Sequence, residues 1–113
     1  MMLRAALFAL CLLAAPLGFA APTPVPADKA AYVGDWSGEN MRLHIQQDGH
    51  VKYKRDRKGK NVDVTVDLQG FNGDNFDVGF ALVRSTFVVG KPPHREGGKW
   101  TMTVDGVELT RAE

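Results

Sequence analysis

The chain has 113 residues, and its 14 lysines and arginines nearly balance its 13 aspartates and glutamates. This balance gives no reason to expect nucleic-acid or membrane binding through overall charge. The single cysteine, Cys11, excludes an intramolecular disulfide and a cluster of cysteine metal ligands.

Residues 1–20 have the features of a secretory signal peptide. Arg4 provides a positive start, and residues 5–20 form an apolar run without charge. Gly18 and Ala20 are small residues placed for cleavage after Ala20. A membrane anchor is the alternative, but the run is short for a bilayer span and a proline interrupts it. We therefore predict a periplasmic or secreted protein that does not span the membrane after cleavage.

Residues 21–31 predict a tether, because prolines spaced along it favour an extended chain. Asp28 can cap a single helical turn at its end. Residues 32–113 then predict one domain. Short stretches of alternating apolar and polar residues, separated by turn signals about every eight to twelve residues, favour a β-sandwich or β-barrel.

The first strand contains Trp36, and a hairpin follows it. Directly paired residues must face the same side of a sheet. A three-residue loop, residues 47–49, satisfies this rule by pairing Ile45 with Val51. Gly49 then supplies the left-handed residue of a bulged turn.

Three further strands are predicted at residues 62–68, 76–80 and 85–89. The first two alternate cleanly, which indicates one buried and one exposed face. Residues 90–98 predict a loop, because the two prolines within it cannot donate to a strand ladder.

The last hairpin turns at residues 105–106, an Asp-Gly pair typical of a two-residue turn. This register pairs Val104 with Val107. It also brings Arg111 onto the apolar face, opposite Trp100.

Together these elements predict an all-β fold, a small antiparallel up-and-down meander barrel of about eight short strands. We expect the narrow interior to be filled by side chains, giving a packed core rather than a ligand cavity. The side chains expected to point inward are Leu43, Ile45, Tyr53, Val64, Val66, Leu68, Phe76, Val78, Phe80, Phe87, Trp100, Met102 and Leu109.

Two features resemble the lipocalin-type (calycin) barrels. Gly34 and Trp36 form a Gly-x-Trp pattern at the start of the first strand, and Arg111 lies near the end of the last. The resemblance implies that Arg111 packs over Trp36 to close one end of the barrel. The chain is also similar to small exported bacterial β-barrel proteins. It departs from lipocalins in its short length and in lacking a disulfide and a predicted C-terminal helix, so the resemblance implies architecture and little about ligand.

No pattern indicates catalysis, and we predict neither a cofactor nor a bound metal. Ser37 and Ser85 are the only serines, and neither lies in a nucleophile elbow. The histidines, expected to be solvated on the surface, are His44, His50 and His94. The carboxylates expected to face outward and aid solubility are Asp63, Asp67 and Asp77.

Residues 52–60 hold six basic residues and one acidic residue. They predict either a solvated hairpin or a docking surface for an anionic partner such as phospholipid headgroups, an acidic polysaccharide or an acidic protein. No exposed aromatic residue interleaves with them, so nucleic acid is not predicted as a partner. The surface comprises Lys52, Lys54, Arg55, Arg57, Lys58 and Lys60.

The leading hypothesis is an exported, non-catalytic binding or scaffold module that contacts an envelope protein or an anionic surface. The first alternative is an inhibitor or immunity-type protein of a cell-envelope enzyme, because a rigid scaffold can present inserting loops. Its inserting loop comprises Pro92, Pro93, His94 and Arg95. The second alternative, a carrier of a small hydrophobic ligand, is implied by the resemblance alone.

Overall fold

The computed structural model describes residues 21–112, and nearly all of its regular structure is β-strand. A short 3-10 helix, Ala27–Tyr32, precedes nine antiparallel strands that form a single sheet. The strands are β1 (Gly34–Ser37), β2 (Met41–Ile45), β3 (His50–Arg57), β4 (Lys60–Asn72), β5 (Asn75–Phe80), β6 (Val83–Phe87), β7 (Val89–Glu96), β8 (Lys99–Val104) and β9 (Val107–Arg111).

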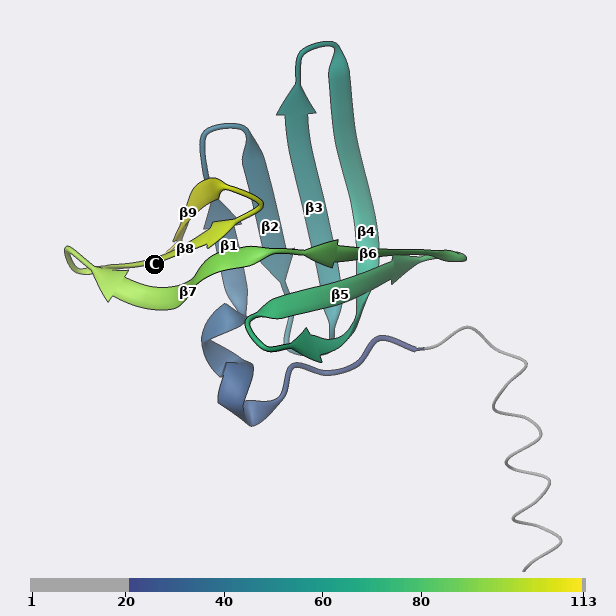
Figure 1. Cartoon of the computed structure of the whole chain (residues 1–113), viewed down its shortest axis with the longest axis horizontal. Coiled ribbons are helices and arrows are strands. Elements are labelled where there is room, and N and C mark those ends of the chain that lie inside the picture. Colours follow the sequence, from purple (N-terminus) through teal and green to yellow (C-terminus); the bar gives the residue numbers. More distant parts are fainter. Residues whose placement is uncertain (1–20, 113) are drawn as a thin grey trace, which may run out of the picture.

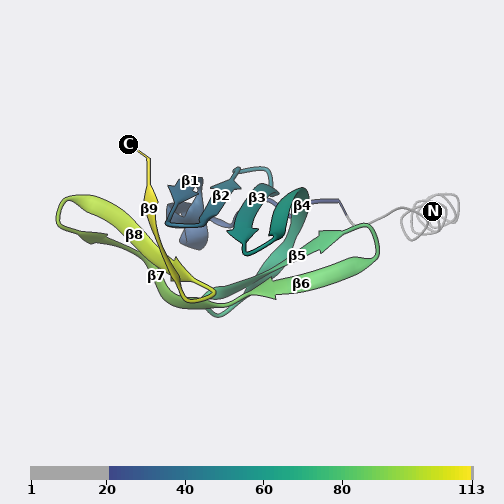
Figure 2. The ribbon, with the colours of Figure 1, turned by 90° about the horizontal axis from the view of Figure 1, so that it is seen from above.

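The sheet curls into a half-barrel. Its strand order is β6-β5-β4-β3-β2-β1-β9-β8-β7, so every pairing but one joins sequence neighbours, the exception being the pairing of β1 with β9. Figure 1 shows β1 to β4 side by side, with β5, β6 and β7 crossing in front of them, and Figure 2 shows the curl from above. The predicted all-β, up-and-down fold is confirmed, with nine strands and an open curl.

The opening lies where β6 and β7 meet. A single residue, Val88, separates the two strands, which pair with β5 and β8 respectively and not with each other. The front of the molecule is therefore made by two hairpins, β5–β6 and β7–β8, that point in opposite directions (Figure 2). Each of these two strands has one unpaired edge.

Both hairpin registers predicted from the sequence are confirmed. Ile45 pairs with Val51, and Gly49 has a φ of 98°. Val104 pairs with Val107. Asp105 and Gly106 both have positive φ, which is the geometry a two-residue turn of this kind requires.

The core fills the closed part of the half-barrel, and nine of the thirteen side chains expected to point inward are buried. Tyr53, Val64 and Trp100 are partly buried against this core. Phe80 shares the inner face with these residues, but 56% of its surface is exposed, so it is not part of the packed core. Phe80 lies beside the β5–β6 turn, which extends beyond the strands that cover the rest of β5 (Figure 2).

The segment predicted as a tether is part of the folded domain. Thr23 N–H donates to the Leu68 carbonyl at 2.7 Å, and Val25 N–H donates to the Gln47 carbonyl at 2.9 Å. The Val25 side chain is only 3% exposed. The helical turn predicted after it is present, but no side chain caps it, so the capping role predicted for Asp28 is wrong.

The loop predicted at residues 90–98 is also wrong, because β7 occupies most of it. The two prolines are tolerated for two reasons. β7 is an edge strand, and its pairing with β8 shifts register between Val89 and Lys91 and again between Lys91 and His94. A proline on an edge strand or at a bulge is tolerated, because no partner strand needs the backbone N–H that proline lacks.

The predicted signal peptide, residues 1–20, lies outside the described residues. Within residues 21–112, no helix is long and apolar enough to cross a membrane.

Candidate functional site

The closed end of the half-barrel is built around Trp36. Its side chain is fully buried, and its indole N–H donates to the Tyr32 carbonyl at 2.9 Å. Arg111 is directly opposite Trp36 in the β1–β9 pair. The guanidinium carbon of Arg111 lies 5.8 Å from the Trp36 ring centroid and 4.9 Å from that of Trp100. Both distances are within the range of a cation–π contact.

Gly34 makes room for this arrangement. Its φ is 147°, and a Cβ built there would lie 2.6 Å from Cδ of Arg111. A side chain at this position would therefore displace Arg111 from the tryptophan. Gly34, Trp36 and Arg111 therefore form one packing unit at the closed end.

The basic residues of the β3–β4 hairpin do not form one surface. Alternation along β3 sends Lys52 and Lys54 to the outer face, where they pair with His44 and Arg42 of β2. The same alternation sends Arg55 and Arg57 to the inner face, opposite Val62 and Lys60. Lys58 lies in the turn between the two strands.

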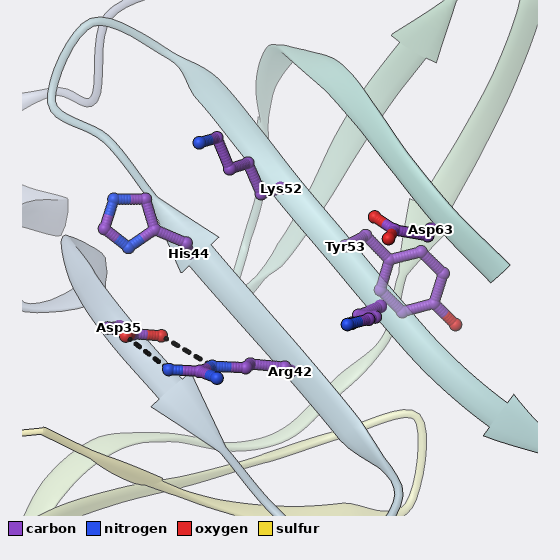
Figure 3. A pocket seen from close by; sticks show the side chains of 7 residues that line it. Asp35, Arg42, His44, Lys52, Tyr53 and Asp63 are labelled. Carbon is purple, nitrogen blue, oxygen red and sulfur yellow. Dashed lines mark hydrogen bonds and ion pairs between the residues drawn. The ribbon is translucent and has the colours of Figure 1, made fainter.

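The outer face carries mixed charge. A hollow of about 310 Å³ there is bordered by Lys52 and Lys54 together with Asp35 and Asp63 (Figure 3). Asp35 also forms a 3.0 Å ion pair with Arg42, and this hydrogen-bonded contact raises the pKa of the arginine. Two carboxylates, Asp35 and Asp63, partly offset the three cations Lys52, Lys54 and Arg42, so this hollow carries mixed charge.

The inner face opens into two adjoining hollows, which we call the mouth. The apolar hollow has a volume of about 210 Å³ and the basic hollow about 270 Å³. Tyr53, Val62 and Asp105 line both, so the two hollows are continuous along the inner wall. The aliphatic and phenylalanine side chains of the apolar hollow are Val62, Val64, Val66, Val78, Phe80, Val83 and Phe87.

The basic hollow carries excess positive charge. Arg55, Arg57 and Lys60 line it, and Asp105 is the single carboxylate among its lining residues. The Nε atom of Arg55 is buried and has no hydrogen-bond partner. An unsatisfied cationic donor beside two further cations is complementary to an anionic group. The interior is packed at the closed end, and the two hollows of the mouth lie on the inner face beyond that core.

Residues 92–95, predicted as an inserting loop, lie in β7 and are held along it. His94 Nδ1 is 2.8 Å from the Pro92 carbonyl, and its Nε2 is 3.1 Å from the Thr101 hydroxyl. Arg95 donates to the Gly98 carbonyl at 3.0 Å. These contacts fix the segment against β8, so it is not a free loop.

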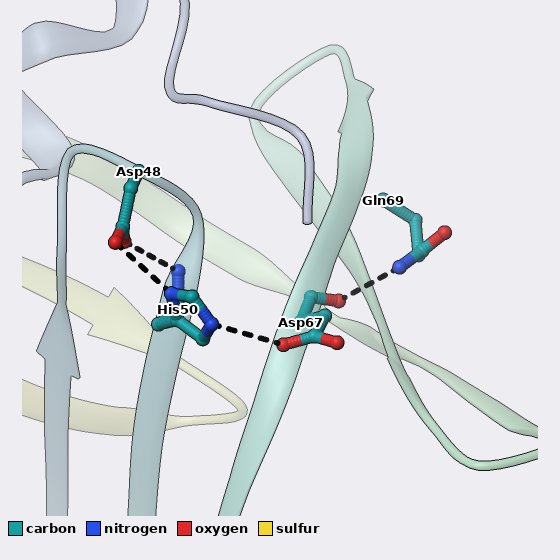
Figure 4. A network of polar contacts seen from close by, with 4 residues as sticks. All are labelled: Asp48, His50, Asp67 and Gln69. Atoms are coloured by element: carbon teal, nitrogen blue, oxygen red, sulfur yellow. Dashed lines mark hydrogen bonds and ion pairs between the residues drawn. The ribbon is translucent and has the colours of Figure 1, made fainter. Parts of the chain in front are cut away.

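A polar network lies at the opposite end of β3 from the mouth (Figure 4). His50 lies between two carboxylates, 3.0 Å from Asp48 and 3.9 Å from Asp67. The hydrogen bond from the His50 backbone N–H lowers the pKa of Asp48. The β3–β4 register places Asp67 opposite His50, so two carboxylates flank this surface histidine. Even so, residues 21–112 contain no group of three or more metal-binding side chains suitably placed for an ion.

Sequence reasoning missed the mouth because it treated every inward apolar residue as core. One signal was present. The turn between β5 and β6 is Ala81-Leu82, and it lacks the glycine, asparagine, aspartate and proline typical of turns. Leu82 is 88% exposed and Val83 66% exposed. Apolar residues at a turn indicate a contact surface rather than folding needs.

The fold and the mouth together define a small all-β half-barrel with one open, amphipathic end. In comparisons with protein-family models, curated proteins and solved structures, nothing matches this chain.

Proposed function

We propose that this protein is an exported, non-catalytic binding module with a lipocalin-like half-barrel. In this proposal the mouth is its binding surface, and the ligand joins an apolar chain to an anionic group. The observation that carries the proposal is the continuity of an apolar hollow with a basic one, through the shared Tyr53, Val62 and Asp105.

The two hollows would contribute differently to binding. Removing apolar surface from water contributes roughly 25 cal/mol per Å², so the valine-lined hollow supplies most of the affinity. The basic hollow selects the sign of the ligand's charge, because Arg55 already has an unpaired buried donor. Of the two alternative functions, the ligand carrier gains support from the mouth. The inhibitor alternative loses the loop on which it was based, since that segment is β7.

The test is calorimetric titration with sodium laurate, a probe with one apolar chain and one carboxylate. We expect laurate to bind and dodecyltrimethylammonium, which has the same chain and the opposite charge, not to bind. Laurate affinity should also fall with added salt, as expected for a contact between charges.

The chain offers a matched control for the charged hollow. The double variant Arg55→Gln/Arg57→Gln should weaken laurate binding by about tenfold or more, because charge-assisted hydrogen bonds are lost. Lys52→Gln/Lys54→Gln removes the same charge from the same strand on its other face and should leave the affinity unchanged. Equal weakening by both variants, or no laurate binding at all, would contradict the proposal.

A further inference from the structure

The two unpaired edges of the sheet are protected to different degrees. β7 carries Pro92, Pro93 and two register shifts, which discourage pairing with another strand. β6 has the sequence VRSTF, with no proline or glycine, and pairs with β5 without a shift. A regular, unblocked edge is a template for a further strand.

The backbone groups on the free edge of β6 can be assigned. The two-residue turn makes Phe80 and Val83 a hydrogen-bonded pair. The backbone N–H and carbonyl groups of residues 83, 85 and 87 therefore point toward β5, and those of residues 84, 86 and 88 point toward the free edge. The contacts of Val88 agree with this alternation. Its N–H donates to the Asp105 carboxylate at 2.9 Å, and its carbonyl accepts the Asp105 N–H at 2.8 Å. The edge groups of Arg84 and Thr86 are left to an added strand.

These groups are self-complementary. If two copies of β6 run antiparallel with Ser85 on the twofold axis, Arg84 of one copy lies opposite Thr86 of the other. Each such pair exchanges two backbone hydrogen bonds. Symmetry repeats the pair, so all the N–H and carbonyl groups of Arg84 and Thr86 in both copies are satisfied.

Side chains on both faces fit the same register. On the outer face, Asp77 lies directly across Thr86 within one copy. The exposed Arg84, which makes no ion pair within residues 21–112, would therefore point across Thr86 of the other copy toward that copy's Asp77. On the inner face, the exposed Val83 would lie opposite Phe87. The backbone hydrogen bonds, the approach of Arg84 to Asp77 and the contact of Val83 with Phe87 all favour the same antiparallel register centred on Ser85.

We propose that a second copy of this chain docks on the free edge of β6, giving a symmetric dimer with Ser85 at its centre. The proposal goes beyond the proposed function, because it concerns the edge groups of Arg84 and Thr86, which line neither hollow of the mouth. The inner-face side chains of the same strand, Val83, Ser85 and Phe87, do line the apolar hollow, so the dimer would border the mouth. The interface uses one short strand per copy, so the dimer is weak and depends on concentration.

A cysteine at the twofold axis tests the register. With Cys11→Ser in place, Ser85→Cys gives the chain a single thiol. Directly opposed residues in a non-hydrogen-bonded pair lie about 4.5 Å apart at Cα, within the range for a disulfide. We expect mild oxidation to yield a covalent dimer. Thr86→Cys is the matched control, because residues 86 of the two copies are offset along the strands and beyond that range. A covalent dimer of the Thr86→Cys variant but not of the Ser85→Cys variant would overturn the register.

A proline on the free edge tests the dimer without a disulfide. Arg84→Pro removes an N–H that makes no bond to β5, so the hairpin should remain intact. Sedimentation velocity over a range of concentrations should show a dimer for the unaltered chain. The dimer should be about tenfold or more weaker for Arg84→Pro, which loses one backbone hydrogen bond per copy.

Two control measurements test whether Arg84→Pro changes the stability of the fold or the binding of laurate, in addition to the dimer. Ser85→Pro, one residue along, removes a bond to β5 and should lower thermal stability, whereas Arg84→Pro should not. Laurate titration of Arg84→Pro shows whether the mouth, which includes Val83, Ser85 and Phe87 of β6, still binds when the dimer is weakened. A chain that stays monomeric at every soluble concentration, or an Arg84→Pro variant that dimerises equally well, would overturn the proposal.

Discussion

At the scale of single residues, the closed end depends on one large side chain and one charge. Trp36 has no exposed surface, and Arg111 lies between the rings of Trp36 and Trp100. The Nη1 atom of Arg111 also donates to the Ala31 carbonyl at 3.5 Å. A partly buried guanidinium is costly without partners, and here two ring faces and the Ala31 carbonyl are its partners.

Trp36→Ala should therefore lower the free energy of unfolding by about 3–5 kcal/mol, as truncation of a buried aromatic does. Arg111→Ala should cost about 0.5–2 kcal/mol, the range of a cation–π contact. In the Trp36→Ala background the arginine effect should shrink. Urea denaturation of the two single variants and the double variant measures this coupling, and strictly additive losses would show that the two residues do not interact.

At the scale of elements, the β8–β9 turn holds the front of the molecule together. Asp105 has a φ of 49° and ties the turn to Val88 by the two hydrogen bonds described above. One aspartate thus closes a hairpin and also fixes the point where β6 passes into β7. A turn residue chosen only for its conformation would not supply the second contact.

Asp105→Ala should destabilise the protein by about 1–3 kcal/mol, since it removes an acceptor and places alanine at positive φ. Asp105→Asn should cost much less, because asparagine tolerates this conformation and keeps a side-chain oxygen for Val88. Thermal unfolding of the two variants checks the order. Equal losses would show that neither the positive φ nor the side-chain acceptor at residue 105 explains the choice of aspartate.

At the scale of the whole molecule, the N-terminal segment contributes to the fold. Residues 23 and 25 make backbone hydrogen bonds to Leu68 of β4 and to Gln47 in the β2–β3 turn, and Val25 is buried. A chain beginning at Ala27 should be less stable than one beginning at Ala21 by about 2 kcal/mol, from one buried valine and its hydrogen bonds. Pro24→Ala, which changes an exposed residue of the same segment, should have little effect on the melting temperature.

Local rules were enough to predict most of the fold. The parity of paired residues placed Ile45 opposite Val51, and Asp-Gly predicted the last turn. Two kinds of information were missing. The burial of Val25 depends on a long-range contact that no local pattern encodes. The strand at Pro92 depends on lying at an edge, which is a property of the assembled sheet.

The candidate site was harder to predict from the sequence, because it also depends on how distant strands are arranged. The cluster of basic residues was visible in the sequence, but the division into Lys52 on one face and Arg55 on the other follows from strand alternation. The apolar hollow beside Arg55 requires the β5–β6 hairpin to lie across β4, which only the three-dimensional arrangement gives.

The pairing of β1 with β9 has a consequence for folding kinetics. All other strand pairs join sequence neighbours, so each can form as a local hairpin with a small loss of chain entropy. The β1–β9 seam instead closes a loop that includes almost the whole domain, and such contacts form late. Substitutions at this seam, Trp36 among them, should therefore act mainly by speeding unfolding rather than by slowing folding. The contact that closes the half-barrel then sets how long the folded state persists.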